Sequence, residues 1–106
     1  MQFNDLKEFI KEEDKRLRER YGNYIDDEKR ILARTVKITE ELGELCDEVL
    51  SFSSLQRQDK LDKHDRNNLS DEFADVIITT LLLADTMEVD IEQALEDKIK
   101  KIRLRS

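Results

Sequence analysis

Apolar residues recur at intervals of three and four along four segments of the chain, a spacing that places them on one face of an α-helix. We therefore predict helices over residues 4–21, 27–52, 69–87 and 91–104. The second segment shows the clearest pattern, which steps by alternating threes and fours from Ile31 to Phe52. The pattern predicts an all-α protein.

Short polar residues indicate where these helices begin, because their side chains can accept hydrogen bonds from the first free backbone amides. The expected N-caps are Asn4 for the first helix, Asp26 or Asp27 for the second, and Asn68 and Ser70 for the third. In the fourth helix, Asp90 and Gln93 have the spacing of a capping box. Each predicted helix therefore has a local start signal.

The third predicted helix differs from the others in being apolar on nearly every side between Phe73 and Ala84. A helix of this kind belongs at the centre of a bundle. The polar connector before it, residues 53–68, is expected to be a loop. Prolines are absent and only two glycines occur, so strands and tight turns have little punctuation. These features favour a four-helix bundle.

Length and charge limit how much core one chain can bury. The 106 residues suit a single domain spanning residues 1–106, and 42% of them are charged. A chain of this size and polarity gains stability by pairing an apolar face with a second copy. We expect an all-α, four-helix bundle completed by homo-oligomerisation, as a homodimer or a homotetramer.

The charge balance and the terminus restrict the partners and the compartment. A net charge of -7 disfavours sequence-independent binding to nucleic acid, which requires cationic side chains. No apolar run is long enough to cross a bilayer, and the N-terminal residues do not resemble a signal peptide. The single Cys46 has no partner for an intramolecular disulfide. We expect a cytoplasmic protein that binds neither nucleic acid nor membrane.

Acidic residues of the second helix occupy two different faces. At about 100° per residue, Glu40 falls nearly opposite the apolar stripe. Glu41, Glu44 and Glu48 follow one flank, in line with Lys37, and Glu41 lies close to the apolar edge. Taken alone, this row is typical of a solvated flank with oppositely charged neighbours three and four residues apart.

Acids of the third helix make a metal-binding role for those of the second more plausible than a solvated flank alone. Glu72 and Asp75 are three residues apart and share one face of the most hydrophobic helix. Acids in a first turn can simply stabilise the helix dipole, which suffices for Asp71 and Glu72. Asp75 lies a turn deeper, between Ala74 and Val76. A carboxylate held among core residues needs a cation or a proton.

Two helices that each present a carboxylate pair, packed face to face, would bring four carboxylates together. Such a set of hard oxygen ligands suits Mg²⁺ or Mn²⁺, whereas zinc prefers nitrogen or sulfur ligands. A di-iron site would need Glu-x-x-His pairs, and the single His64 has Leu61 and Asn67 three residues away. Cys46 lacks a neighbouring histidine or lysine, so we interpret it as a small, semi-buried residue.

Two acidic motifs in this order resemble the MazG-like, all-α nucleoside triphosphate pyrophosphohydrolases. The sequence "EELGE", from Glu40 to Glu44, is similar to the first family motif, and "EFAD", from Glu72 to Asp75, is similar to the second. The polar connector and the ending "VDIEQALEDKIKKIRLR" also look like this family. The resemblance covers roughly residues 28–105.

The resemblance implies roles for individual side chains. Four acids would coordinate Mg²⁺, with Mn²⁺ as a substitute: Glu41, Glu44, Glu72 and Asp75. Glu41 or Glu44 would also serve as the catalytic base, a choice that stays open. Lys98 and Lys101 match basic positions that can approach the substrate phosphates in this family. Apart from the resemblance, Lys37 would add local positive charge for substrate binding together with these two lysines. Relatives often carry an asparagine on the last helix, where this chain has Ile99 and Ile102.

The implied activity is hydrolysis of a nucleoside triphosphate between its α and β phosphates, which gives a monophosphate and pyrophosphate. A phosphoribosyl-ATP pyrophosphohydrolase has the same architecture and cleaves the same bond, so it is an alternative. An alternative of another class is a non-catalytic helical interaction or regulatory protein whose acids only keep its surface soluble. The base of the substrate and the biological role stay open.

Overall fold

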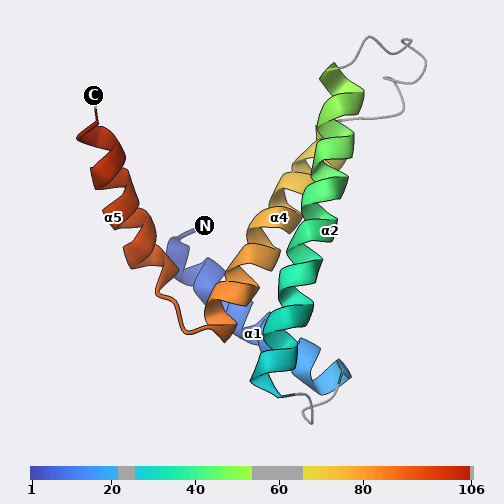
Figure 1. Cartoon of the computed structure of the whole chain (residues 1–106), viewed down its shortest axis with the longest axis vertical. Coiled ribbons are helices and arrows are strands. Elements are labelled where there is room, and N and C mark those ends of the chain that lie inside the picture. The colour runs from blue at the N-terminus through green and yellow to red at the C-terminus, as the bar shows by residue number, and fades with distance from the viewer. Residues whose placement is uncertain (22–25, 54–65, 106) are drawn as a thin grey trace. The chain divides into compact units, whose positions relative to one another are not determined.

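Four helices and no strands make up the described part of the chain, residues 1–21, 26–53 and 66–105 of a computed structural model. The helices are α1 (Phe3–Tyr21), α2 (Asp27–Ser53), α4 (Arg66–Thr86) and α5 (Ile91–Arg103), shown in Figure 1. None of them combines the length and hydropathy that a membrane span requires. The all-α class with four helices is confirmed. His64 and most of the predicted connector lie outside the described residues.

The starts of the first two helices depend on aspartate side chains. Asp26 caps α2, since its Oδ1 accepts a hydrogen bond from the backbone N–H of Lys29 at 2.8 Å. Asn4 is not the cap of α1, because α1 already begins at Phe3. There the backbone N–H of Gln2 donates to Asp5 Oδ2 at 2.8 Å. This bond runs from a side chain inside the first turn back to the residue before the helix, as in the reciprocal half of a capping box, so Asp5 does not act as an N-cap.

The first turns of α4 include residues that we expected to precede it. The helix begins at Arg66, before the expected start at residue 69, so Asn68 and Ser70 lie inside it and do not cap it. No proline or glycine occurs between residues 66 and 70 to stop the helix from extending towards its N-terminus. Polarity alone was therefore a poor guide to the boundary.

The start of α5 forms half of the predicted capping box. Asp90 Oδ1 accepts a hydrogen bond from the backbone N–H of Gln93 at 3.1 Å, as expected for an N-cap. The reciprocal bond is replaced by another one, because the Gln93 side-chain amide donates to Asp97 Oδ1 at 3.0 Å. A neighbour four residues along the helix competes successfully for this amide.

A left-handed residue ends α4. Glu88 has a φ of 58°, the only positive φ of a non-glycine residue in the described part of the chain. The backbone N–H of Val89 donates to the carbonyl oxygen of Ala84 at 2.9 Å, and that of Glu88 donates to the carbonyl oxygen of Asp85 at 3.1 Å. This pair of bonds is a Schellman motif, in which the left-handed position is usually a glycine.

The chain divides into two compact units, one formed by residues 1–31 with 81–106 and the other by residues 32–80. In the first unit, a small apolar core surrounds Ile10 of α1 and Leu81 and Leu82 of α4, which are 4%, 8% and 6% exposed. A cavity of about 300 Å³ lies beside this core and is lined by residues of α1, α4 and the start of α5. The single domain spanning residues 1–106 stays a prediction.

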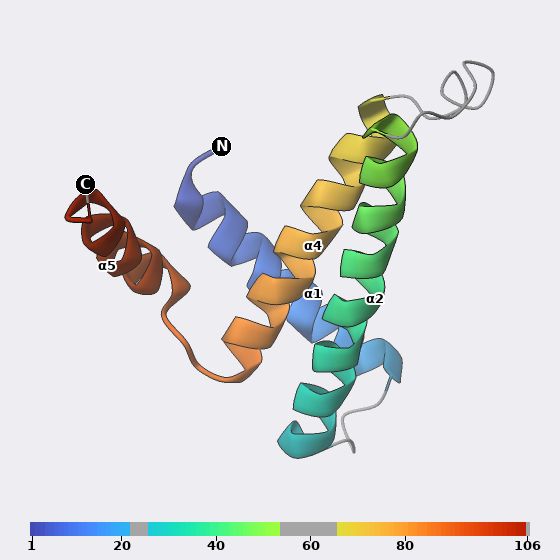
Figure 2. The same cartoon turned by 45° about the horizontal axis from the view of Figure 1, so that its top comes forward.

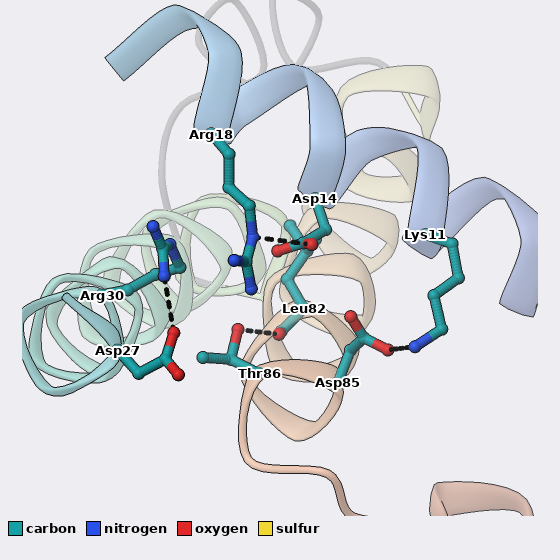
Figure 3. A network of polar contacts seen from close by, with 8 residues as sticks. All are labelled: Lys11, Asp14, Arg18, Asp27, Arg30, Leu82, Asp85 and Thr86. Atoms are coloured by element: carbon teal, nitrogen blue, oxygen red, sulfur yellow. Dashed lines mark hydrogen bonds and ion pairs between the residues drawn. The ribbon is translucent and has the colours of Figure 1, made fainter. Parts of the chain in front are cut away.

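Ion pairs link the helices of this first unit. Figure 3 shows Lys11 of α1 paired with Asp85 of α4, and Arg18 paired with Asp14 along α1. A longer contact of 3.8 Å joins Lys7 of α1 to Glu92 of α5. Because these groups are largely or partly solvated, each pair contributes little stability, and packing around Ile10 contributes more.

In the second unit, α2 and α4 run antiparallel and side by side. Figures 1 and 2 both show this arrangement. Several residues that we predicted to be buried are exposed to solvent. Leu42 and Val49 of α2 are 48% and 37% exposed, and Phe73 and Ile77 of α4 are 49% and 55% exposed. The central position expected for α4 is therefore wrong for this unit within a single chain, because one neighbouring helix can cover only one face.

Candidate metal site

Glu41 is the buried acid of α2. It is 8% exposed, although the chain around it is highly charged. The packed face of α2 includes Ile38 and Leu45, which are partly buried, and Glu41 lies between them in the helical repeat. The predicted apolar stripe is thus rotated towards the acidic flank, which turns the carboxylate of Glu41 towards α4.

Two acids of α4 meet this carboxylate. One carboxylate oxygen each from Glu41, Glu72 and Asp75 lies within 4.8 Å of the others. Glu72 and Asp75 come from one face of α4 because they are three residues apart. Three of the four predicted metal ligands are therefore brought together, from two helices that are far apart in the sequence.

Two oxygens in this carboxylate cluster are buried without a hydrogen-bond donor. Within the part of the chain that the structure describes, Glu41 Oε2 and Glu72 Oε2 have no hydrogen-bond partner. A buried acceptor without a donor is costly, and more so when it carries charge. Oxygen ligands of this kind fit a hard divalent cation such as Mg²⁺ or Mn²⁺. The residues present therefore fit the implied metal.

The electrostatics of the cluster also favour a cation. Burial raises the pKa of Glu72, and the negative charge of Glu44 raises it further. The pKa of Asp75 is raised by desolvation of its carboxyl group first and by the charge of Glu41 second. Asp75 as a residue is nevertheless exposed, so the expectation that it lies among core residues is wrong. Asp75 interacts with the cluster through the negative charge of Glu41, which lies nearby.

Glu44 adjoins the cluster without joining the three converging oxygens. The residue is exposed, and its pKa is raised chiefly by the negative charge of Glu41. Asp75 contributes a smaller effect in the same direction. The assignment of Glu44 as a metal ligand therefore stays a prediction, while its closeness to Glu41 is a feature of the structure.

Lys37 places a positive charge beside the buried acid of this cluster. Its Nζ lies 3.3 Å from Glu41 Oε1 and 3.4 Å from Glu40 Oε2. Hydrogen bonds to Glu41 and then to Glu40 raise the pKa of Lys37. The Glu40 side chain is 58% exposed, as its predicted position opposite the apolar stripe implies. Its pairing with Lys37 was not predicted, although a spacing of three residues was the available signal.

The other predicted site residues are not linked to the cluster by the structure. Lys98 and Lys101 are exposed on α5, in the first unit, and their contact with substrate stays a prediction. Cys46 is exposed, so our interpretation of it as semi-buried is wrong. It belongs to the open side of α2, which the single neighbour α4 leaves uncovered.

A comparison with known families gives one match. The model of the MazG-like family matches residues 32–104, which include all three converging acids as well as Lys37 and Glu44. Searches of curated proteins and of solved structures gave no match. The matched residues make up well over half of the chain and include α4, α5 and most of α2. The chain belongs to the MazG-like family.

Proposed function

We propose that the protein is a Mg²⁺-dependent nucleotide pyrophosphohydrolase that cleaves nucleoside triphosphates between the α and β phosphates. The observation that carries this proposal is the meeting of Glu41, Glu72 and Asp75 within 4.8 Å, with orphaned buried oxygens on Glu41 and Glu72. Membership of the MazG-like family supports the reaction class. The products would be a nucleoside monophosphate and pyrophosphate.

The three converging carboxylates would hold the metal, and Glu44 lies beside them. When bound, the divalent ion supplies positive charge that offsets the charge developing on the phosphoryl oxygens and on the leaving pyrophosphate. Lys37 places a positive charge beside the cluster, where it would bind the substrate phosphates. Lys98 and Lys101 are proposed to contribute further positive charge there.

Glu44 is the better of the two predicted bases. Glu41 is buried and its Oε1 is paired with Lys37, whereas Glu44 is exposed to the solvent that supplies the attacking water. We therefore assign proton abstraction from water to Glu44.

The reaction is tested by incubating a panel of canonical and modified nucleoside triphosphates with the protein and Mg²⁺ and measuring pyrophosphate release. Glu44→Gln should reduce the rate by about 100-fold or more, the scale of losing a general base. Glu28→Gln, at an exposed position of the same helix, is the matched control and should keep wild-type activity. If no nucleotide yields pyrophosphate, the proposed reaction is wrong.

The same panel separates the two enzymatic alternatives. Preferential cleavage of phosphoribosyl-ATP would identify the enzyme as a phosphoribosyl-ATP pyrophosphohydrolase, since only the substrate distinguishes the two. Activity on ordinary or modified nucleoside triphosphates would support the proposal as stated.

A non-catalytic role is tested by the metal alone. Mn²⁺ or Mg²⁺ should raise the melting temperature of the wild type, because a ligand that binds only the folded state stabilises it. Asp75→Ala should lose most of that increase, while Asp47→Ala, an exposed acid of α2, should keep it. Equal increases in all three proteins would contradict a metal site at the cluster and favour the non-catalytic alternative.

Self-association remains part of the proposal. Large apolar side chains stay open along α5, where Leu95, Ile99 and Ile102 are 45%, 46% and 53% exposed. An amphipathic helix with an uncovered apolar stripe gains stability by packing against another surface. We propose that a second copy of the chain covers it, in a homodimer or a homotetramer.

A further inference from the structure

We propose that Lys37 is the resident counter-cation of the carboxylate cluster, held on Glu41 until a divalent ion arrives and then released to bind the phosphates of the substrate. The inference rests on the proposed metal site and assigns Lys37 a role beyond simple phosphate binding. In this role Lys37 competes with the metal and cooperates with the nucleotide.

The geometry supplies two alternative acceptors for one ammonium group. Lys37 Nζ lies between Glu41 Oε1 at 3.3 Å and Glu40 Oε2 at 3.4 Å. The two carboxylates differ in their surroundings, since the Glu41 side chain is 10% exposed and the Glu40 side chain is 58% exposed. One acceptor therefore belongs to the cluster and the other to the solvent side of the same helix.

The two carboxylate oxygens of Glu41 differ in their hydrogen-bond and ion-pair partners. Oε1 is occupied by Lys37, whereas Oε2 is buried and has no hydrogen-bond partner in the described part of the chain. A divalent ion bound at Oε2 would lie on the same carboxylate as the ammonium group and repel it. By rotation of its side chain, Lys37 could then leave Glu41 and keep its ion pair with Glu40.

Release changes what Lys37 can bind. On Glu41 and Glu40 the ammonium group is shared between two carboxylates, and Lys37 has a half-exposed side chain. Once the cation at the cluster neutralises Glu41, the ammonium group is held less strongly and can donate to phosphate oxygens. Metal and nucleotide would then each favour the binding of the other, through the same side chain.

The first test uses Mn²⁺ alone, without nucleotide, and measures its dissociation constant by isothermal titration calorimetry. Lys37→Met should bind Mn²⁺ about five- to tenfold more tightly than the wild type, the scale of repulsion between a monovalent and a divalent cation about 5 Å apart in water with salt. Lys37→Arg keeps the charge and should stay close to the wild type. Lys29→Met removes the same charge from an exposed position of α2 and is the matched control.

The second test adds a nucleotide analogue whose α,β-bridging atom is a methylene carbon, at saturating Mn²⁺. Lys37→Met should bind this analogue several-fold more weakly than the wild type, although it binds the metal more tightly. A merely structural role for Lys37 would not change the two affinities in opposite directions. Circular dichroism verifies that each variant is folded, and Lys37→Gln replaces the methionine variant if that one is not.

The outcomes separate this inference from the proposed function. If the wild type binds Mn²⁺ and Lys37→Met binds it equally or less tightly, Lys37 is not a competing counter-cation, and the metal site itself stands. If the wild type binds no Mn²⁺ or Mg²⁺, the metal site and this inference are both wrong. Tighter metal binding together with weaker analogue binding in Lys37→Met supports the inference.

Discussion

Individual carboxyl groups form the candidate metal site, and their properties depend on their neighbours as well as on their residue type. Glu41 and Glu40 are adjacent in the sequence, yet one is 8% exposed and the other faces solvent. Glu72 and Asp75 have raised pKa values because their carboxyl groups are desolvated and close to other acids. Without a cation, this concentration of negative charge opposes folding.

The pH dependence of stability follows from the sign of these shifts. The pKa of Asp75 in the folded chain lies above its ordinary value of 3.8. The folded state therefore holds this proton more strongly than the unfolded state, so the contribution to stability is present below the ordinary value and is lost as pH rises through the folded value. Ionised Asp75 consequently destabilises the metal-free protein at neutral pH.

We expect Asp75→Asn to raise the free energy of unfolding of the metal-free protein at pH 7 by roughly 0.5 kcal/mol, the scale of a solvent-screened charge interaction. The gain should vanish as pH falls below about 3.8, where the wild-type carboxyl group is protonated in both states. Urea unfolding with a chelator present, at a series of pH values, measures the difference.

Asp47→Asn, at an exposed position of α2, is the control and should show no comparable gain. A stabilisation by Asp75→Asn that is independent of pH would contradict an electrostatic origin. In saturating Mn²⁺ the order should reverse, because the wild type then has a cation to bind and the variant has lost a ligand.

At the scale of single helices, the turn from α4 to α5 contains a residue in an unfavourable backbone conformation. Glu88 adopts a φ of 58° in a Schellman motif, where a side chain crowds the backbone and glycine does not. The sequence offers no glycine at this place to signal the turn. The hydrogen bonds of Val89 and Glu88 to the carbonyl groups at the end of α4 hold the conformation.

Glu88→Gly should therefore stabilise the protein by roughly 0.5–1 kcal/mol, because the left-handed conformation costs a non-glycine residue about 1–2 kcal/mol and glycine adds some entropy to the unfolded state. The midpoint of urea unfolding measures the change. Glu88→Ala removes the same carboxylate but keeps the Cβ atom, so it should not reproduce the gain. Equal stabilisation by both variants would mean that the carboxylate, and not the backbone, is responsible.

The N-cap of α5 provides a second prediction at this scale. Asp90→Ala removes the acceptor of the Gln93 backbone N–H and should lower the free energy of unfolding by about 1 kcal/mol. Gln93→Ala is the control, since its side chain bonds Asp97 instead of completing the box. It should cost only a few tenths of a kcal/mol. A larger loss in Gln93→Ala than in Asp90→Ala would contradict this description of the cap.

For the whole molecule, the main consequence is that one chain leaves much apolar surface uncovered. Phe73 and Ile77 of α4 and Ile99 of α5 are each about half exposed, at 49%, 55% and 46%. Among the described residues, the buried apolar side chains are Ile10, Leu81 and Leu82. A core of this size is small for a chain of 106 residues. Self-association is the expected remedy.

Ile99→Glu should shift the protein towards the monomer and lower its melting temperature, because a charged group would have to be buried at the proposed interface. Light scattering after size-exclusion chromatography, over a range of protein concentrations, measures the mass. Lys100→Gln changes the net charge by the same amount on the same helix and should leave the mass unchanged. A wild-type protein that is monomeric at every concentration would contradict the proposed self-association.

The helices were largely predictable because their signals are local. Periodic apolar residues, the cap at Asp26 and the cap at Asp90 operate within a few residues of each other along the chain. The misassigned boundaries, Asn4 and the start of α4 at Arg66, lie where several short polar residues compete for the same role. Both errors moved a helix end without changing the number of helices.

The two acidic motifs indicated which acids could bind a metal, and the range of the family match includes both motifs. Sequence spacing was sufficient to place Glu72 and Asp75 on one face of a helix, because the α-helical repeat is regular. The pairing of Glu41 with Lys37 is also local, because the two residues are four apart on α2. Only the packing of α2 against α4 decided that Glu41 is buried and that three carboxylate oxygens converge within 4.8 Å. Burial and convergence depend on residues distant in the sequence, so no local pattern could establish them.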